Sequence, residues 1–369
     1  FSRFTGLAVG NLYLIAAACT LWEVFARYVL HSPTQWVFEV VMVLCACAWM
    51  LSAGFVTLQK RHIGITVFYL MASPRVQWWL DLFAMVVGVF ALYMLAGDTL
   101  IRALESIDLT ERLGSAWNSP QPMVLKTVLV LGLFIYLVQL LVNLTRHFRT
   151  RPLQVATLAL LALICLRFLL QIAAHYGGYD SPFAAIDGAI SETGSAFVDR
   201  FHVDRDAWGI GTISLLIVIA LIMLMITGMP LGIVTLIISV VCALLFYGTN
   251  GMYLVSTNAV DLLEKYPLVA VPFFVLMASI LERSGIARDL FDAMSIFAGG
   301  FRGGVALQTT IVAVILAAMS GVMGGEIVML GLVALPQMLR LGYNRNLTIG
   351  LICASGALAT LIPPSIVMI

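Results

Sequence analysis

Charged side chains are scarce in this sequence. Only 11% of the 369 residues are Asp, Glu, Lys or Arg, and 62% are hydrophobic; soluble domains carry about 25% charged residues. The formal net charge is +1, so the sequence offers no basic surface that would attract nucleic acid or an acidic partner. The composition excludes an ordinary soluble domain and a nucleic-acid-binding protein, and it predicts a polytopic membrane protein surrounded by lipid.

The signatures of metal, haem and nucleotide chemistry are also missing. All six cysteines lie in apolar runs without metal-ligand spacing, and the five histidines lie in loops or near the ends of apolar runs. No glycine-rich phosphate loop precedes a helix. We therefore expect no cofactor and no ATPase domain. Because the chain begins at Phe1 and ends at Ile369 inside an apolar run, we also expect it to be a fragment.

Long apolar runs dominate what is present. A bilayer core about 30 Å thick requires about 20 apolar residues per spanning helix. By this measure five spans are expected before a polar stretch at 176–207, and further apolar runs follow it. The first five are 5–29, 36–57, 77–97, 123–143 and 153–174, and the later ones are 209–227, 231–248, 266–282 and 304–361.

Lysine and arginine predict how these spans are oriented. Cations follow the second and fourth spans, at 60–75 and 146–151, whereas 98–122 and 176–207 are mainly acidic. Short cytoplasmic loops are enriched in Lys and Arg. The N-terminus is therefore expected in the cytoplasm and the stretch 176–207 outside.

The same rule predicts a re-entrant hairpin at 303–339. Arginines precede this segment at 283–302 and follow it at Arg340 and Arg345, so both of its ends belong on the inner side. Residues 320–325 interrupt it with a glycine-rich tip. Non-helical backbone at membrane depth is tolerated only when it is buried in protein or lines a cavity, and transporters build their sites from such segments.

A second interruption is predicted in the helix that begins near 346. Pro363 and Pro364 should leave the carbonyls of Ala359 and Thr360 without helical partners, and a broken helix exposes such oxygens to a cation. A kink satisfied by neighbouring helices is the alternative. Two adjacent prolines followed by Ser365 favour a functional break.

Several ionisable residues lie within the predicted spans. Glu326 follows the hairpin tip. One interpretation gives it a function as a cation ligand, a proton carrier or a substrate contact. The alternative is that it only caps the second hairpin helix. The remaining charges favour structural ion pairs between helices over a proton relay. They include Glu23, Arg27, Glu39 and Arg167.

Residues 209–369 resemble the first half of the large membrane subunit of a tripartite ATP-independent periplasmic (TRAP) transporter. The matching segments occur in the same order as in the family, from Gly228 to the double proline. They are Gly228-Met229-Pro230-Leu231-Gly232, Pro267 to Phe274, Glu282 to Ala287, Gly303 to Ala306, Ser320-Gly321, Ala334 to Met338, Gly342-Tyr343 and Ile362 to Ser365.

Residues 5–150 resemble the four-helix small subunit of the same family. The matching segments are Arg27-Tyr28-Val29, Trp36 with Glu39, and Gln59-Lys60-Arg61-His62-Ile63. Together the two resemblances suggest a fused protein with a small-subunit scaffold at 1–152, a linking helix and connector at 153–207, and the N-terminal half of the large transport subunit at 208–369. The resemblance implies an all-α fold of the elevator type, with a hairpin at 303–339 and a broken helix at 346–369.

The resemblance also implies a function in the bacterial inner membrane. It implies sodium-driven import of an organic anion, a carboxylate or sulfonate, delivered by a periplasmic substrate-binding protein and moved by an elevator-like mechanism, without enzymatic activity. Rival functions are an ion-coupled anion transporter that needs no binding protein, and a membrane assembly subunit that transports nothing. The implied sodium site consists of Ser320, Gly321, Gly324, Gly325, Ser355, Gly356, Pro363, Pro364 and Ser365.

The sequence departs from the family pattern near this site. Val322 and Met323 stand where many relatives have serines, and Ala359 stands where glycine is common. Backbone carbonyls or Glu326 would then replace hydroxyl ligands at the tip.

Overall fold

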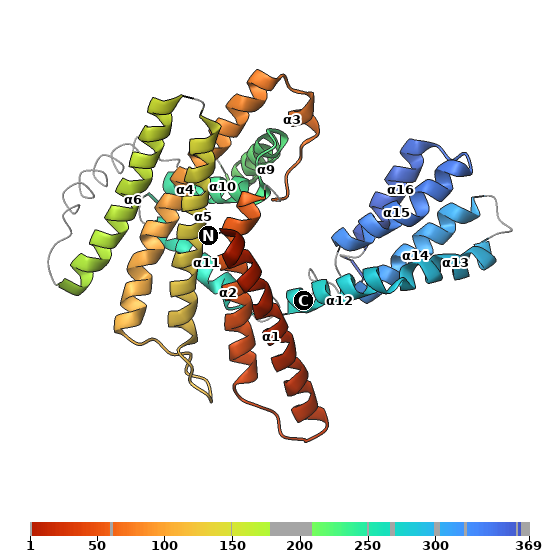
Figure 1. The fold of residues 1–369 in the computed structure, drawn as a ribbon, viewed down its shortest axis with the longest axis horizontal. Helices are drawn as coiled ribbons and strands as arrows, with labels where there is room; N and C mark the ends of the chain where they lie inside the picture. Colours follow the sequence, from red (N-terminus) through yellow and green to blue (C-terminus); the bar gives the residue numbers. More distant parts are fainter. Residues whose placement is uncertain are drawn as a thin grey trace. The chain divides into compact units, whose positions relative to one another are not determined.

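The protein is described by a computed structural model that divides into two compact units, Phe1–Glu264 and Lys265–Ile369. Helices form the regular structure of the described residues, which contain no strand (Figure 1). The described residues are 2–59, 62–148, 150–177, 209–248, 251–265, 270–298, 303–320, 323–358 and 361–362.

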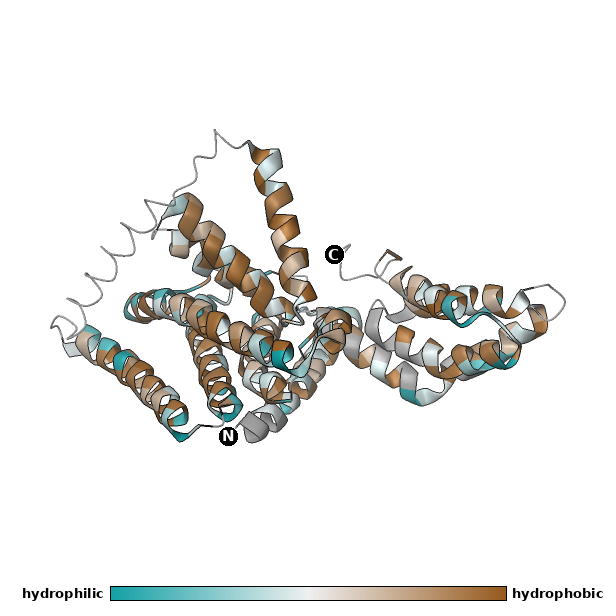
Figure 2. Ribbon diagram, turned by 90° about the horizontal axis from the view of Figure 1, so that it is seen from above, coloured by the Kyte–Doolittle hydropathy of each residue, from teal (hydrophilic) through white to brown (hydrophobic). Residues whose placement is uncertain are grey.

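Within the described residues, five helices are long and apolar enough to cross a membrane, and all five lie in the first unit. They confirm the predicted all-α polytopic membrane fold, and their apolar surfaces are apparent in Figure 2. The helix α4 has 35 residues, longer than the run 77–97 predicted for it. The five helices are α1 (Ser2–Tyr28), α2 (Val37–Leu58), α4 (Pro74–Asp108), α5 (Gln121–His147) and α6 (Arg151–Gly177).

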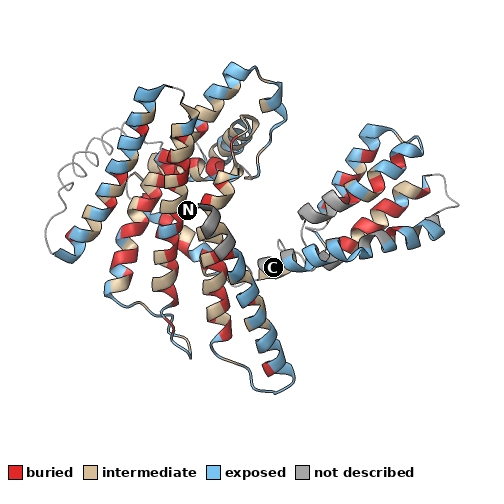
Figure 3. Cartoon of the chain, viewed as in Figure 1, coloured by how far each residue is buried: buried red, intermediate tan, exposed pale blue. Residues whose placement is uncertain are grey.

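The core of the first unit lies mainly between α4 and α5, and α2 packs on α5 beside it. Leu92, Leu125 and Leu137 are almost fully buried there, and buried residues concentrate along the facing sides of these helices (Figure 3). Gly132 of α5 lies against Met50 of α2, where a β-carbon would come 2.7 Å from the Met50 Cβ. The missing side chain is what lets the two helices approach.

The described part of the first unit contains four further helices. The helices α9 (Ile210–Ile226) and α10 (Leu231–Tyr247) match predicted apolar runs, whereas α3 (Val67–Met71) and α11 (Gly251–Leu263) were not predicted. Both α10 and α11 pack on α4. The segment 209–264 therefore shares one compact unit with the first 150 residues.

The second unit has its own core. Phe291, Leu316, Leu330 and Ile352 are buried together there. The helix α13 had not been predicted, because its charges hide it from a search for apolar runs. The helices of this unit are α12 (Ala270–Ser284), α13 (Ile286–Ala298), α14 (Gly304–Ser320), α15 (Met323–Arg340) and α16 (Arg345–Ala357).

The contact at Gly132 predicts a stability difference between two glycine substitutions. Gly132→Ala should lower the free energy of unfolding by about 1–3 kcal/mol, because the new methyl group overpacks the contact with Met50. Gly97→Ala in α4 is the control, since a β-carbon there meets nothing within 4 Å. Thermal unfolding in detergent measures both, and equal melting temperatures would contradict the packing described here.

Candidate functional site

Two helices occupy the place of the predicted hairpin. The helices α14 and α15 have 17 and 18 residues, which at 1.5 Å per residue gives lengths slightly below the thickness of a bilayer core, about 30 Å. Thr309, near the start of α14, donates its hydroxyl to Sδ of Met338, near the end of α15, over 3.8 Å. The two helices therefore run antiparallel.

The interruption between these helices is shorter than expected. The sequence placed the tip at 320–325, but α14 continues to Ser320 and α15 starts at Met323. The backbone of Gly324 and Gly325 is therefore helical, and only residues 321 and 322, which include Gly321, lie outside the described residues. Helical hydrogen bonding accommodates both glycines in the first turn of α15.

Glu326 occupies the first turn of α15, where the positive end of the helix dipole favours an acid. The side chains of Glu326 and Ser320 lie outside the described residues. The backbone thus places Glu326 beside the hairpin tip.

The helix α16 ends before the double proline. It starts after Asn344, whose side chain accepts a hydrogen bond from the Asn346 N–H, and its last residue is Ala357. Leu361 and Ile362 donate their N–H groups to the Leu358 carbonyl at 2.9 and 3.1 Å. Pro363, Pro364 and Ser365 lie outside the described residues, as do Ala359 and Thr360.

The end of α16 meets the start of α15. Gly356 is buried against Ile327, the residue after Glu326, so closely that a β-carbon at Gly356 would overlap the Ile327 side chain. Ser355 is 3% exposed. The structure therefore brings Gly356 to the fifth residue of α15, one residue after Glu326.

This junction combines helix ends of opposite polarity. Helix ends leave carbonyls and N–H groups outside the regular helical bonding pattern. At the end of α16 the Ser355 and Gly356 carbonyls accept from the Leu358 N–H, and the Leu358 carbonyl accepts from Leu361 and Ile362. The C-terminus of a helix attracts cations and the N-terminus attracts anions. Such a junction can bind a cation through carbonyl and hydroxyl oxygens. Among the described residues no group of three His, Cys, Asp or Glu side chains could hold a metal ion.

The predicted structural charges lie in the first unit, away from this junction in the chain. Glu23 and Arg27 form an ion pair of 2.6 Å within α1, and Glu23 also accepts a hydrogen bond from the Thr34 N–H at 3.1 Å. The Arg167 guanidinium lies 4.9 Å from the centre of the Tyr93 ring, which connects α6 with α4.

Glu39 is only 4% exposed and accepts a hydrogen bond from the Ser119 hydroxyl. Glu39 lies in the first turn of α2, and Ser119 lies two residues before Gln121, the first residue of α5. The carboxylate therefore lies near the positive ends of two helix dipoles, which stabilise a buried negative charge.

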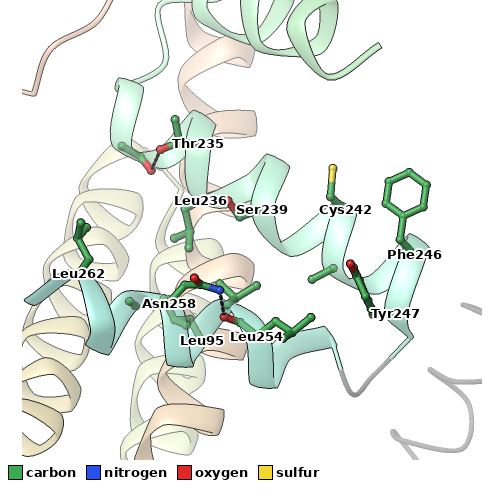
Figure 4. A pocket seen from close by; sticks show the side chains of 14 residues that line it. Leu95, Thr235, Leu236, Ser239, Cys242, Phe246, Tyr247, Leu254, Asn258 and Leu262 are labelled. Carbon is green, nitrogen blue, oxygen red and sulfur yellow. Dashed lines mark hydrogen bonds between the residues drawn. The ribbon is translucent and has the colours of Figure 1, made fainter. Parts of the chain in front are cut away.

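The first unit also contains a cavity of about 600 Å³ between α10 and α11. Its lining is mostly apolar, with Thr235, Ser239 and Asn258 as polar exceptions (Figure 4). Asn258 donates to the Leu254 carbonyl and Thr235 to the Leu231 carbonyl, so both of these side chains bond their own helices. None of the predicted site residues lines this cavity.

A smaller cavity of about 430 Å³ is lined by charged residues of α4, α5 and α11. At its edge Lys126 forms an ion pair with Glu111, which also accepts a hydrogen bond of 2.5 Å from the Ser106 hydroxyl. The Lys126 ammonium, followed by the Ser106 hydroxyl, lowers the pKa of the Glu111 carboxyl below its ordinary value of 4.5.

Two family models match the chain. "Tripartite ATP-independent periplasmic transporters, DctQ component" matches residues 16–150, and "Tripartite ATP-independent periplasmic transporter, DctM component" matches residues 218–369. The two matches fall on the regions that the sequence motifs had indicated.

Individual relatives match in the second of these regions. The C4-dicarboxylate TRAP transporter large permease protein DctM of Rhodobacter capsulatus is 38% identical over 152 residues, covering 40% of this chain and 34% of the relative. The ectoine TRAP transporter large permease protein TeaC of Halomonas elongata is 32% identical over 155 residues, 42% of this chain and 36% of the relative.

The name of a third relative, DctMQ, joins the letters of the DctM and DctQ components. The isethionate TRAP transporter permease protein DctMQ of Oleidesulfovibrio alaskensis is 26% identical over 141 residues, covering 38% of this chain and 22% of the relative. The chain spans about a third or less of the length of these curated relatives. All three names describe transport permeases rather than enzymes.

The fold defines an all-α polytopic membrane protein with a helical hairpin packed against a helix that ends early. The two family matches make the identification more specific. The chain belongs to the TRAP transporter family and joins a small-component region to part of a large-component region.

The close packing at Gly356 predicts that adding a single methyl group there impairs transport. Gly356→Ala should displace α16 from α15 and lower sodium-dependent uptake by the complete protein at least about tenfold, since small misplacements of binding groups have effects of this size. Gly350→Ala is the matched control, because a β-carbon there meets nothing within 4 Å. Uptake is measured in proteoliposomes at equal protein content, and wild-type uptake by Gly356→Ala would remove this junction from the site.

The ion pair of Glu111 predicts a pH-dependent contribution to stability. Because folding lowers the pKa of Glu111, the pair stabilises the fold above about pH 4.5 and this contribution is lost as the pH falls further. Glu111→Gln should therefore lower the melting temperature at pH 7, and the difference from wild type should shrink towards pH 4. A difference that stays constant with pH would contradict this assignment.

Proposed function

We propose that the chain is the membrane component of a sodium-coupled secondary active importer of organic acids. The family membership supports transport, and the contact of Gly356 with Ile327 is the observation that supports ion coupling. That contact gathers the carbonyl end of α16 and the start of α15 at one place. Secondary transporters bind coupling ions at such interrupted helices.

The proposed sodium site is the junction of the hairpin tip with the end of α16. Its buried hydroxyl is Ser355, and its carbonyls come from the last turn of α16. The residues expected from the sequence complete it: Ser320, Gly321, Gly324 and Gly325 at the tip, and Pro363, Pro364 and Ser365 after α16. Glu326 in the first turn of α15 borders the ion and the substrate path.

The proposed substrate is a carboxylate or sulfonate that a periplasmic binding protein delivers. The named relatives are permeases for C4-dicarboxylates, ectoine and isethionate, which supports a small organic acid. The protein would lie in the bacterial inner membrane with its N-terminus in the cytoplasm. The division into two units with separate cores supports an elevator-like mechanism, in which a transport part moves relative to a scaffold.

Uptake by the complete protein in proteoliposomes tests this proposal against its rivals. We expect uptake only when an inward sodium gradient and the cognate binding protein are both present. Uptake that persists without the binding protein would favour an independent anion transporter. Absence of uptake with the complete protein and a matched partner would favour a membrane assembly subunit.

Two substitutions test the proposed site directly. Glu326→Gln removes a charge next to the tip, and Pro364→Ala restores an N–H that can extend the helix, so both should reduce the apparent sodium affinity more than expression. The matched controls are Glu105→Gln and Pro152→Ala, which change exposed residues of the first unit. Sodium dependence of initial uptake rates measures the effect, and wild-type values in both site variants would exclude these positions.

A further inference from the structure

An exposed apolar stripe runs along the first half of α4. It consists of Trp79, Phe83, Val86 and Phe90, which are all exposed although each side chain is large and apolar. Their spacing of four, three and four residues places them on one face of the helix. At 1.5 Å per residue the stripe is about 17 Å long, which is close to half the thickness of a bilayer core. The stripe therefore has the length of a single lipid leaflet.

Three exposed arginines gather at the end of the unit where this stripe begins. Arg75 lies in the first turn of α4, four residues before Trp79, so it continues the stripe towards the helix start. Arg146 lies in the last turn of α5, and Arg151 is the first residue of α6 (Figure 1). Within the described residues none of the three forms an ion pair. We call Arg75, Arg146 and Arg151 the arginine cluster.

Side-chain contacts hold the three helix ends together. His147 Nε2 donates to the Trp78 carbonyl at 3.2 Å, and the two rings stack with 5.0 Å between their centres. The Gln154 amide of α6 donates to the Phe148 carbonyl at 2.7 Å. Because His147 follows Arg146 directly, these bonds fix the end of α5 and the start of α6 beside the start of α4.

The short helix α3 adds apolar surface at this end. It contains no buried residue, and Phe68, Leu70 and Met71 are exposed. The Gln77 amide donates at 3.0 Å to the Tyr69 carbonyl, which ties α3 to the start of α4. Exposed apolar side chains beside cations suit the boundary between lipid headgroups and acyl chains.

The charge near the cluster is positive. Asp81 is the only acidic residue between 62 and 97, and its carboxylate accepts a hydrogen bond of 3.0 Å from the Tyr69 hydroxyl. The stretch 140–160 contains no acidic residue. The distribution of Lys and Arg predicts that this end faces the cytoplasm. The surface therefore offers cations at the headgroup level and apolar side chains below it.

We propose that this surface is a binding site for an anionic phospholipid of the inner leaflet. The phosphate lies at the arginine cluster, because guanidinium groups bind phosphate oxygens in pairs and cations near the membrane surface attract anionic lipids. One acyl chain lies along the stripe of α4, whose length matches one leaflet. This inference does not depend on sodium coupling or on the transported substrate.

Native mass spectrometry of the complete, delipidated protein tests the inference. The probes are dioleoyl phosphatidylglycerol, dioleoyl phosphatidylcholine and glycerol 3-phosphate, which separate the anionic headgroup from the chains. We expect phosphatidylglycerol to bind at least about tenfold more tightly than phosphatidylcholine, since two or more arginines contribute to the difference. Equal affinity for the two lipids would overturn the proposal. Binding of glycerol 3-phosphate as tight as that of phosphatidylglycerol would also overturn it, because a soluble anion would then suffice.

Arginine substitutions show whether the cluster selects the headgroup. The double variant Arg75→Gln, Arg146→Gln should lose the preference for phosphatidylglycerol, whereas Arg75→Lys with Arg146→Lys should keep most of it because the charge remains. Arg112→Gln is the matched control, since Arg112 is an exposed arginine beyond the other end of α4. An unchanged preference in the double glutamine variant would overturn the role of the cluster.

Phenylalanine substitutions test the stripe separately. Phe83→Ala with Phe90→Ala should weaken the binding of dioleoyl phosphatidylglycerol at least about fivefold and leave dihexanoyl phosphatidylglycerol unchanged, because only the long chain reaches both rings. The control is Phe25→Ala, an exposed phenylalanine of α1. All the substituted residues are exposed, so the packed core does not depend on them. An equal effect on both chain lengths, or none, would contradict the placement of the acyl chain on α4.

Discussion

The proposed function depends on the close contact of Gly356 with Ile327. Backbone N–H and carbonyl groups at membrane depth find no water, so they must bond protein or a bound ion. The end of α16 and the start of α15 come together because Gly356 has no side chain. The proposed ion site lies at this junction.

In the first unit, glycines let helices and turns pack closely against one another. Gly132 brings α5 to α2, and Gly64 and Gly228 bring two turns together, while buried charges are satisfied within the unit. Glu39 is held by Ser119 near two helix starts, and Arg102 bonds α11. These contacts join residues of both family regions into one compact unit. The proposed transport mechanism requires such a unit as its scaffold.

The sequence was sufficient to predict the membrane helices, because apolar length alone determines whether a helix can span a bilayer. It missed α3, which has only five residues, and α11 and α13, which are short and mixed in polarity. The family boundary expected near residue 208 is a different division from that of the compact units, which divide along the chain after Glu264. The reason is that α10 and α11 pack on α4. The contact between Gly356 and Ile327 could not be predicted, since it depends on how α16 packs against the hairpin.

The position of a monovalent cation tests the central claim most directly. Crystals of the complete protein soaked in thallium, a strong anomalous scatterer that can replace sodium, would show the ion in an anomalous difference map. The account predicts a peak within coordination distance of the last carbonyls of α16 and the Ser355 hydroxyl, and sodium should abolish it in competition. A sodium-sensitive peak elsewhere, with none at this junction, would contradict the account.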